Sequence, residues 1–218
     1  LSVHGEKFLV PDFQSIANCD ISTLVSRTNL NTRRLQAVSG SFEFSYNNLA
    51  FVTLRGRNDW SSTLPAENRS YFYPAVDASF ILSELPFVKA NSEVFSYIKV
   101  RGSYAQVGKD APPLSIYPAL ESQSTTAGGY RYGFTGPNLS LRPEMNTAWE
   151  IGLEARLFRN KLDLDFAYYS TFSADQIITG FRMSYATGFV LNNMNVGSFR
   201  TNGVEMRIAG DVFKNRDW

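Results

Sequence analysis

Apolar and polar side chains alternate with a period of two in seven segments of the chain. In residues 71–82, Phe72, Val76 and Phe80 fall on one face, whereas Asp77 and Ser79 fall on the other. Neighbouring side chains of a strand point to opposite sides, so this period predicts strands with one apolar face, whereas a helix would scatter both sets around its surface. The pattern predicts strands in residues 35–46, 49–56, 71–82, 95–106, 147–157, 161–172 and 199–212.

The segments between these strands differ systematically in length. Asn47-Asn48 and Arg159-Asn160 predict tight links, Lys214-Asn215 predicts the start of another, and residues 84–94 form a connector of moderate length. The remaining connectors are long and comprise residues 57–70, 107–146 and 173–198. An antiparallel meander with its short turns at one end and its long loops at the other is typical of outer-membrane β-barrels.

Strand length and composition agree with this interpretation. A tilted strand needs about 9–11 residues to cross a membrane, and several predicted strands are that long, whereas soluble strands most often have about five or six. Aromatic residues make up 14% of the chain and charged residues 19%, a composition that favours strands. A soluble all-β binding module, a sandwich or lectin-like domain, remains the alternative, because alternation alone does not separate a lipid-facing surface from a packed core.

Charge and rare residues exclude several classes of protein. The formal net charge is +1, with no run of basic residues, so we expect no nucleic-acid partner. A single cysteine, Cys19, excludes an internal disulfide framework, and a single histidine, His4, removes His/Cys zinc sites and histidine-centred triads. No apolar stretch approaches the roughly 20 residues of a membrane-spanning helix.

Several blocks of sequence, in order, resemble the barrel of SusC/RagA-like TonB-dependent outer-membrane transporters. Residues 33–64 are similar to that family's hairpin followed by an Arg-x-Asp-x-Ser-Ser loop, here Arg57, Asp59, Ser61 and Ser62, with Trp60 where glycine is common. Similar blocks follow in residues 71–87, in 98–109 with Ala105 in place of a usual glycine, in 138–175 with Arg142-Pro143 in place of a Lys-Trp-like pair, and in 195–207.

The resemblance implies an all-β fold, an antiparallel meander that forms part of a transmembrane barrel of about 22 strands. It implies a place in the bacterial outer membrane and the import of an oligosaccharide or a peptide. It also implies a SusD-like surface lipoprotein over the loops, TonB acting through a plug region that this sequence lacks, contact with membrane lipid, and no cofactor. We therefore expect residues 33–218 to be a partial barrel domain from the middle of such a barrel, with a C-terminus cut before the next strand.

The alternation does not extend to the N-terminal segment, residues 1–32. A further strand near residues 6–10, followed by an extracellular stretch, is one interpretation, but the pattern does not place these residues.

Six residues in the predicted loops are candidates for contact with substrate or partner. Arg57, Asp59 and Trp60 suit sugar hydroxyls and flat sugar faces, although an Arg–Asp pair that stabilises the loop beside a packed Trp is the simpler interpretation. Tyr117, Tyr130 and Tyr132 in the longest loop would line its mouth or form a small core there. These two alternatives stay open.

Carboxylates spaced by two along the strands resemble acid-base pairs but do not require catalysis. Glu150 and Glu154, like Asp163 and Asp165, share a face of their strand, which a hydrated lumen or a plug surface explains. We expect no enzymatic activity and no metal site.

Overall fold

The computed structural model describes residues 2–27, 30–122, 129–184, 186, 188–210 of the chain. These residues fall into two compact units, one within residues 1–32 and one within residues 33–218.

The first unit is a small irregular fold. β1 (Ser2–His4) pairs with β2 (Val25–Arg27), and two 3-10 turns, η1 (Ile16–Asn18) and η2 (Ile21–Thr23), lie between them. The buried Asn18 side chain donates to the carbonyls of Val10 and Phe13 and accepts from the Val10 amide. Residues 6–10 are not the strand that the sequence suggested: only Phe8 makes an isolated bridge, because the side chain of Asn18 replaces a strand partner.

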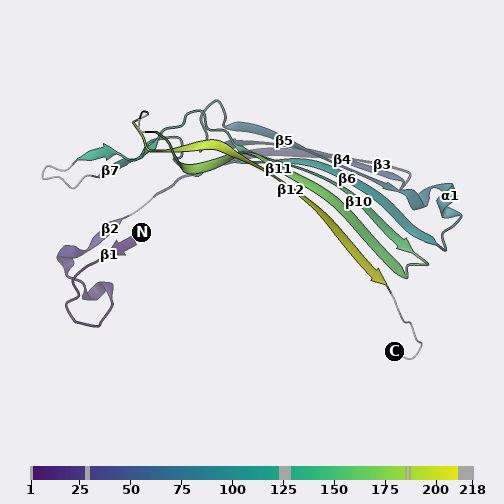
Figure 1. Cartoon of the computed structure of the whole chain (residues 1–218), viewed down its shortest axis with the longest axis horizontal. Coiled ribbons are helices and arrows are strands. Elements are labelled where there is room, and N and C mark those ends of the chain that lie inside the picture. Colours follow the sequence, from purple (N-terminus) through teal and green to yellow (C-terminus); the bar gives the residue numbers. More distant parts are fainter. Residues whose placement is uncertain (1, 28–29, 123–128, 185, 187, 211–218) are drawn as a thin grey trace. The chain divides into compact units, whose positions relative to one another are not determined.

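The second unit is built on one curved sheet, and all seven predicted strands are present in it (Figure 1). They are β3 (Leu35–Tyr46), β4 (Ala50–Ser61), β5 (Ser70–Ile81), β6 (Phe95–Lys109), β10 (Glu144–Leu157), β11 (Leu162–Arg182) and β12 (Leu191–Gly210). Each pairs antiparallel with the next in this order, which confirms the meander.

β11 and β12 are longer than the alternation predicted, so the predicted loop 173–198 shrinks to a short connection between Arg182 and Leu191. The alternation fails there because the paired strands bulge, with register shifts between Ser173 and Gln176 and between Ile178 and Phe181. A bulge breaks the period of two without ending the pairing. The strands therefore continue where the sequence pattern stops. β4 likewise continues to Ser61, so the predicted loop 57–70 shrinks to residues 62–69, and Arg57, Asp59 and Trp60 lie on a strand.

Short turns lie at one end of the sheet. Asn47 and Asn48 both have positive φ, 46° and 54°, which is the backbone of a tight hairpin turn whose twist matches that of the strands. Phe158, Arg159 and Asn160 also have positive φ and close the β10–β11 link. The moderate connector contains η3 (Leu82–Glu84) and the single-turn helix α1 (Pro86–Lys89), with Pro86 in the first turn, where its missing N–H costs nothing. The predicted turn at Lys214-Asn215 lies outside the described residues.

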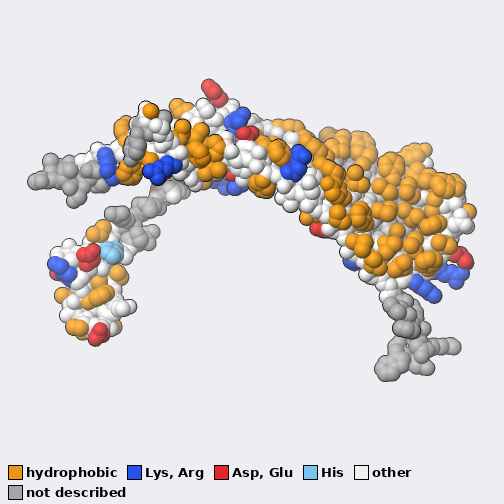
Figure 2. Space-filling view, viewed as in Figure 1, with side chains coloured by type: hydrophobic (Ala, Val, Ile, Leu, Met, Phe, Trp, Pro, Cys, Tyr) orange, Lys and Arg blue, Asp and Glu red, His pale blue; other side chains and the backbone are white. Residues whose placement is uncertain are grey.

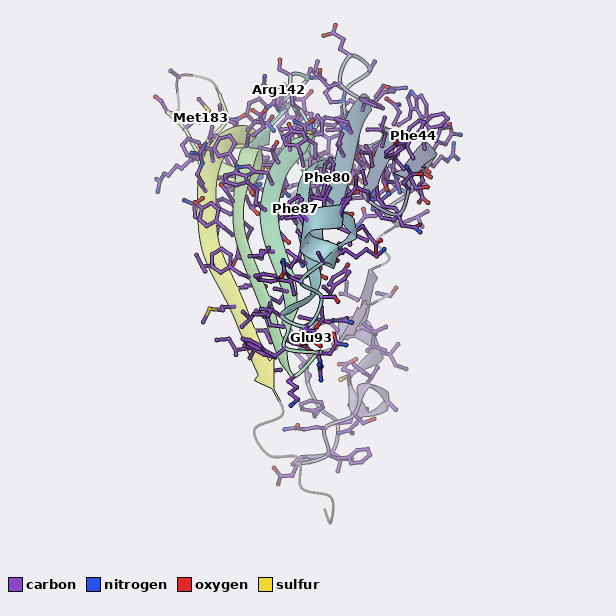
Figure 3. All side chains as sticks on the ribbon, turned by 90° about the vertical axis from the view of Figure 1, so that its right-hand side faces the viewer. Phe44, Phe80, Phe87, Glu93, Arg142 and Met183 are labelled. Carbon is purple, nitrogen blue, oxygen red and sulfur yellow. The ribbon has the colours of Figure 1, made fainter. Side chains whose placement is uncertain are left out.

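The long loops gather at the opposite end, marked by Arg142 and Met183, while Glu93 marks the turn end (Figure 3). The longest loop contains the hairpin of β7 (Leu120–Ser122) and β8 (Tyr130–Tyr132). It also contains β9 (Thr135–Gly136), which pairs parallel with the start of β12. The loop between β6 and β10 therefore reaches past β11 to the far edge of the sheet.

The apolar residues on one face of the strands do not meet in a core. Phe80, Val100 and Phe166 belong to one cross-strand row on one face, and Phe80 and Phe166 remain 49% and 43% exposed. Figure 2 shows hydrophobic side chains gathered over the turn-proximal part of the sheet. The sheet is a single layer within the described part of the chain, whereas a sandwich would cover this face with a second sheet. No helix in that part is long and apolar enough to cross a bilayer.

Candidate functional site

The two faces of the sheet differ in charge. We call the face of Phe80, Val100 and Phe166 the outward face and the opposite one the inner face. Charged side chains at inner positions occur on every strand of the meander, at Glu43, Arg55, Arg57, Asp59, Asp77, Lys99, Arg101, Lys109, Glu144, Glu150, Glu154, Arg156, Asp163, Asp165, Glu205 and Arg207. Among the outward positions of the same described strands on the turn side of the bulges in β11 and β12, only Arg200 carries a charge.

Arg101 is the centre of the largest inner cluster. Its Nε lies 3.2 Å from Glu150 Oε1, and its Nη1 lies 2.6 Å from Glu154 Oε1 and 3.3 Å from Asp165 Oδ1. Lys99 Nζ adds a second contact to Glu154 at 3.3 Å. These side chains stay 27–40% exposed, so each pair is worth at most about 1 kcal/mol, and the cluster acts mainly as a fixed pattern of charge.

Gly152 makes this arrangement possible. A Cβ at this position would lie 2.6 Å from Arg101 Nε, so the guanidinium group occupies space that a side chain would fill. The cluster is therefore built from three adjacent strands, β6, β10 and β11, together with the space that Gly152 leaves on β10, rather than from a local motif.

Two shallow depressions lie along the inner face. One, of about 320 Å³, is lined mainly by polar and charged residues that include Asp77, Lys99, Arg101 and Glu150. Another, of about 440 Å³, is lined by small residues such as Ser39 and Ala105 together with Arg55, Arg57 and Tyr73. Arg55 forms an ion pair with Asp77. A wall of this kind suits water, a hydrated solute or the polar surface of a folded domain.

The hydrophobic core of the second unit lies at the loop end of the sheet. Leu64, Tyr71, Ala111, Ile116 and Leu141 form it, with Tyr73 and Ile177 packed against them. Leu141 is fully buried, and Leu64 is almost fully buried. Loops that carry their own core are held in one conformation, which a binding surface needs.

Asp110 joins three loop segments to this core. Its carboxylate accepts two hydrogen bonds from Arg33, at 2.9 and 2.8 Å, one from Thr63 at 3.0 Å and another from Ser61. The residues that meet here lie up to 77 positions apart in the chain. No local pattern in the sequence identifies such a set, so Asp110 and its partners are not among the residues that the sequence predicts.

Asparagine side chains fasten the longest loop to β11 and β12. Asn193 donates to the carbonyl of Ser115 at 2.8 Å and accepts from the amide of Gly180 at 3.1 Å, while Asn138 donates to the carbonyl of Asn193 at 2.6 Å. Asn195 donates to the carbonyls of Arg142 and Asp175, both at 2.8 Å. Asparagine suits this task because one side chain both donates and accepts.

Arg57 and Asp59 form an ion pair on the inner face. Arg57 Nε lies 2.7 Å from Asp59 Oδ1, and Tyr73 Oη donates to Asp59 Oδ2 at 2.9 Å. Asp59 is 4% exposed, so its charge is already satisfied within the protein. Trp60 is at the next position of β4 and therefore points to the outward face, so the three residues do not form one site.

The three predicted loop tyrosines are all exposed. Tyr130 and Tyr132 share one face of β8, and Tyr132 packs edge-on against Phe189 with ring centroids 6.2 Å apart. None of them belongs to the loop core, which contains Tyr71 instead. Their role in binding stays a prediction, as does that of Arg57, Asp59 and Trp60.

Metal ligands are not gathered anywhere in the described residues: no three His, Cys, Asp or Glu side chains there are arranged to hold an ion. The inner carboxylates instead contact arginine and lysine.

Comparisons with known proteins agree with this geometry. A family model described as "TonB dependent receptor-like, beta-barrel" matches residues 8–218. The chain is 28% identical over 203 residues to the TonB-dependent receptor P26 of Formosa agariphila, covering 90% of this chain and 20% of that protein. The chain thus spans about a fifth of the length of this curated relative.

Two solved structures have a similar fold. One is the RagAB peptide importer in its "open-open" state, with a TM-score of 0.77, 23% identity, and coverage of 94% of this chain and 23% of that chain. The other is the siderophore receptor PirA from Pseudomonas aeruginosa, with a TM-score of 0.54, 20% identity, and coverage of 80% of this chain and 30% of that chain.

Proposed function

Because the chain belongs to the TonB dependent receptor-like β-barrel family of outer-membrane proteins, we propose that it forms part of the wall of an energised importer. The observation that carries this proposal is the contrast between the faces of one curved sheet. From the turn end to the level of Arg200, the outward face carries no charged side chain and is largely apolar, whereas the inner face carries the ion pairs. A strand in a bilayer needs this arrangement, because lipid excludes charge and a hydrated lumen accepts it.

In this proposal, residues 33–218 are a partial barrel domain, and further strands close the barrel around a plug. Closure is required because each unpaired backbone group in hydrocarbon costs several kcal/mol. The short turns face the periplasm and the long loops face the outside, as in barrels of this type. Residues 1–32 form a separate small segment.

The cargo in this proposal is a peptide or an oligosaccharide, and a SusD-like lipoprotein covers the loops while TonB acts through the plug. The exposed tyrosines of the β7–β8 hairpin support a binding role for the loops, since aromatic rings with a polar tip contact both sugar faces and peptide groups. The preorganised loop core supports it as well, because loops ordered in advance lose less entropy on binding.

Uptake by cells that carry the full-length protein tests this function. We expect labelled oligopeptides or oligosaccharides to enter cells with the intact gene and to be excluded when either the gene or TonB is removed. Passage of neither class in a TonB-dependent manner would overturn the proposal.

A pair of variants tests the loop contact. Tyr132→Ala should lower uptake several-fold, whereas Tyr46→Ala, which removes an equally exposed ring (65%) at the turn end of the outward face, should leave it unchanged. Equal effects of the two variants would assign the tyrosines a structural role.

A further inference from the structure

The first and last strands of the meander, β3 and β12, show the same order of residue types on the outward face as they approach the loops. Along β3 and the residue before it, outward positions read Val38, Gln36 and Arg34, from apolar to amide to guanidinium. Along β12 they read Val204, Asn202 and Arg200. Each arginine therefore lies four residues from an outward valine of the same face, in the direction of the loops.

The upper edge of the apolar surface runs obliquely across the sheet. Val204 is in register, through the intervening strands, with Phe44 of β3, whereas the edge on β3 lies at Val38, six residues further along. Six residues rise about 20 Å and six strand spacings cover about 29 Å, which gives an angle of about 35°. Strands of transmembrane barrels tilt by about 35–45°, so the oblique edge becomes level when the strands are tilted in a membrane.

Both arginines consequently lie in one plane parallel to the membrane, at the height where hydrocarbon ends. The energetics agree, because an arginine on the lipid side costs about 2–4 kcal/mol at the bilayer centre but about 0–1 kcal/mol at the interface. On the turn side of the bulges in β11 and β12, Arg200 is the one charged residue at an outward position of the described strands, and the interface is where it is tolerated.

Aromatic rings accompany each arginine. The guanidinium carbon of Arg200 lies 5.3 Å from the centre of the Phe172 ring on β11. Arg34 shares a shallow depression of about 390 Å³ with Gln36, Trp60, Ser61, Ser62 and Arg69. Within the described residues, neither Arg34 nor Arg200 has a carboxylate within ion-pair distance. Glu67, two positions before Arg69, is the acidic residue of the loop that contributes Ser62 and Arg69 to that depression.

We propose that Arg34 and Arg200 form a cationic rim on the lipid-facing side of the barrel that binds phosphate groups of lipid headgroups in the outer leaflet. A guanidinium group matches a phosphate in charge and hydrogen-bond geometry, and a neighbouring aromatic ring suits the boundary between hydrocarbon and water. The continuity of both sites with the apolar face favours a lipid over a dissolved anion. The proposal rests on the family and the faces of the sheet, and does not depend on which cargo is imported.

Native mass spectrometry of the full-length protein in detergent, with added phosphorylated lipid A, tests the rim. Arg34→Gln and Arg200→Gln should each weaken the binding of lipid about fivefold, and the double variant should weaken two separate binding events. Arg131→Gln is the matched control, because Arg131 also lies over an aromatic ring, Phe134 at 5.2 Å, but is in the β7–β8 hairpin. It should leave lipid binding unchanged.

Two further measurements separate the alternatives. Dephosphorylated lipid A should bind the wild-type protein about as weakly as phosphorylated lipid A binds the double variant. Equal binding of both lipids by the wild-type protein would overturn the proposal. This comparison uses the wild-type protein alone, so it holds even where a variant fails to fold. Inorganic phosphate alone should compete poorly, and retention of phosphate in place of lipid would assign the arginines to a dissolved anion. Loss of a co-purifying surface lipoprotein in Arg200→Gln, with lipid binding unchanged, would assign them to that partner and overturn the rim.

Discussion

A lysine at Val100 tests the assignment of the outward face most directly. Val100 lies four residues below Tyr104 on β6, towards the turn end. At about 3.3 Å per residue and a tilt of about 35–45°, it lies about 10 Å below the aromatic edge. The apolar band of such barrels is about 25 Å tall, so Val100 is close to its middle.

At that depth a lysine should lower the free energy of unfolding by about 2–4 kcal/mol. This cost corresponds to a change of about 30- to 700-fold in the ratio of folded to unfolded protein. Leu164→Lys should cost a similar amount, because Leu164 lies the same four residues below Tyr168 on β11. The measurement is a urea titration of the full-length protein in lipid vesicles. The folded fraction at each urea concentration is read from a detergent gel, in which folded protein resists unfolding.

Two controls on the same strand separate lipid contact from a general intolerance of charge. Ser103 is at an inner position in register with Asp77 and Glu150, so Ser103→Lys should change the free energy by less than about 0.5 kcal/mol. Gln106→Lys, outward but above Tyr104, should cost about 0–1 kcal/mol. If Val100→Lys and Ser103→Lys had the same small effect, the outward face would not contact hydrocarbon, and its assignment to lipid would be wrong.

Three further predictions follow from the packing. Gly108→Ala would place a Cβ 2.5 Å from the buried Tyr71 ring and should cost about 1–3 kcal/mol in thermal unfolding, whereas Gly40→Ala, with no atom within 4 Å, should be nearly neutral. Arg101→Gln and Glu154→Gln should show a coupling of about 0.5–1 kcal/mol in a double-mutant cycle, and strict additivity would deny their contact. Asp110→Ala should raise hydrogen exchange in residues 62–69 while leaving the strand amides protected, and unchanged exchange in that loop would contradict its role as a link.

The sequence by itself determined the seven strands, their order as a meander, and the grouping of short turns and long loops at opposite ends. It could do so because a strand with one lipid-facing side repeats its polarity every two residues, and that repeat is local. It also separated the faces: the alternation that places Phe166 opposite Asp165 in the sequence places them on opposite sides of the sheet. The alternation does not reach the bulged extensions of β11 and β12 or residues 57–61 of β4, and the sequence therefore predicts loops there.

Only the tertiary structure decided what the residues of the loops and of the inner wall contact. Asp110 meets Arg33 across 77 positions, and Arg101 meets Asp165 across 64, distances over which no local period carries information. The structure also separated Trp60 from Arg57 and Asp59, which adjacency in the chain had grouped together. The common height of Arg34 and Arg200 relative to the membrane follows only from the register of every strand. The two residues are far apart in the sequence, and the tilt of the strands brings them to the same height.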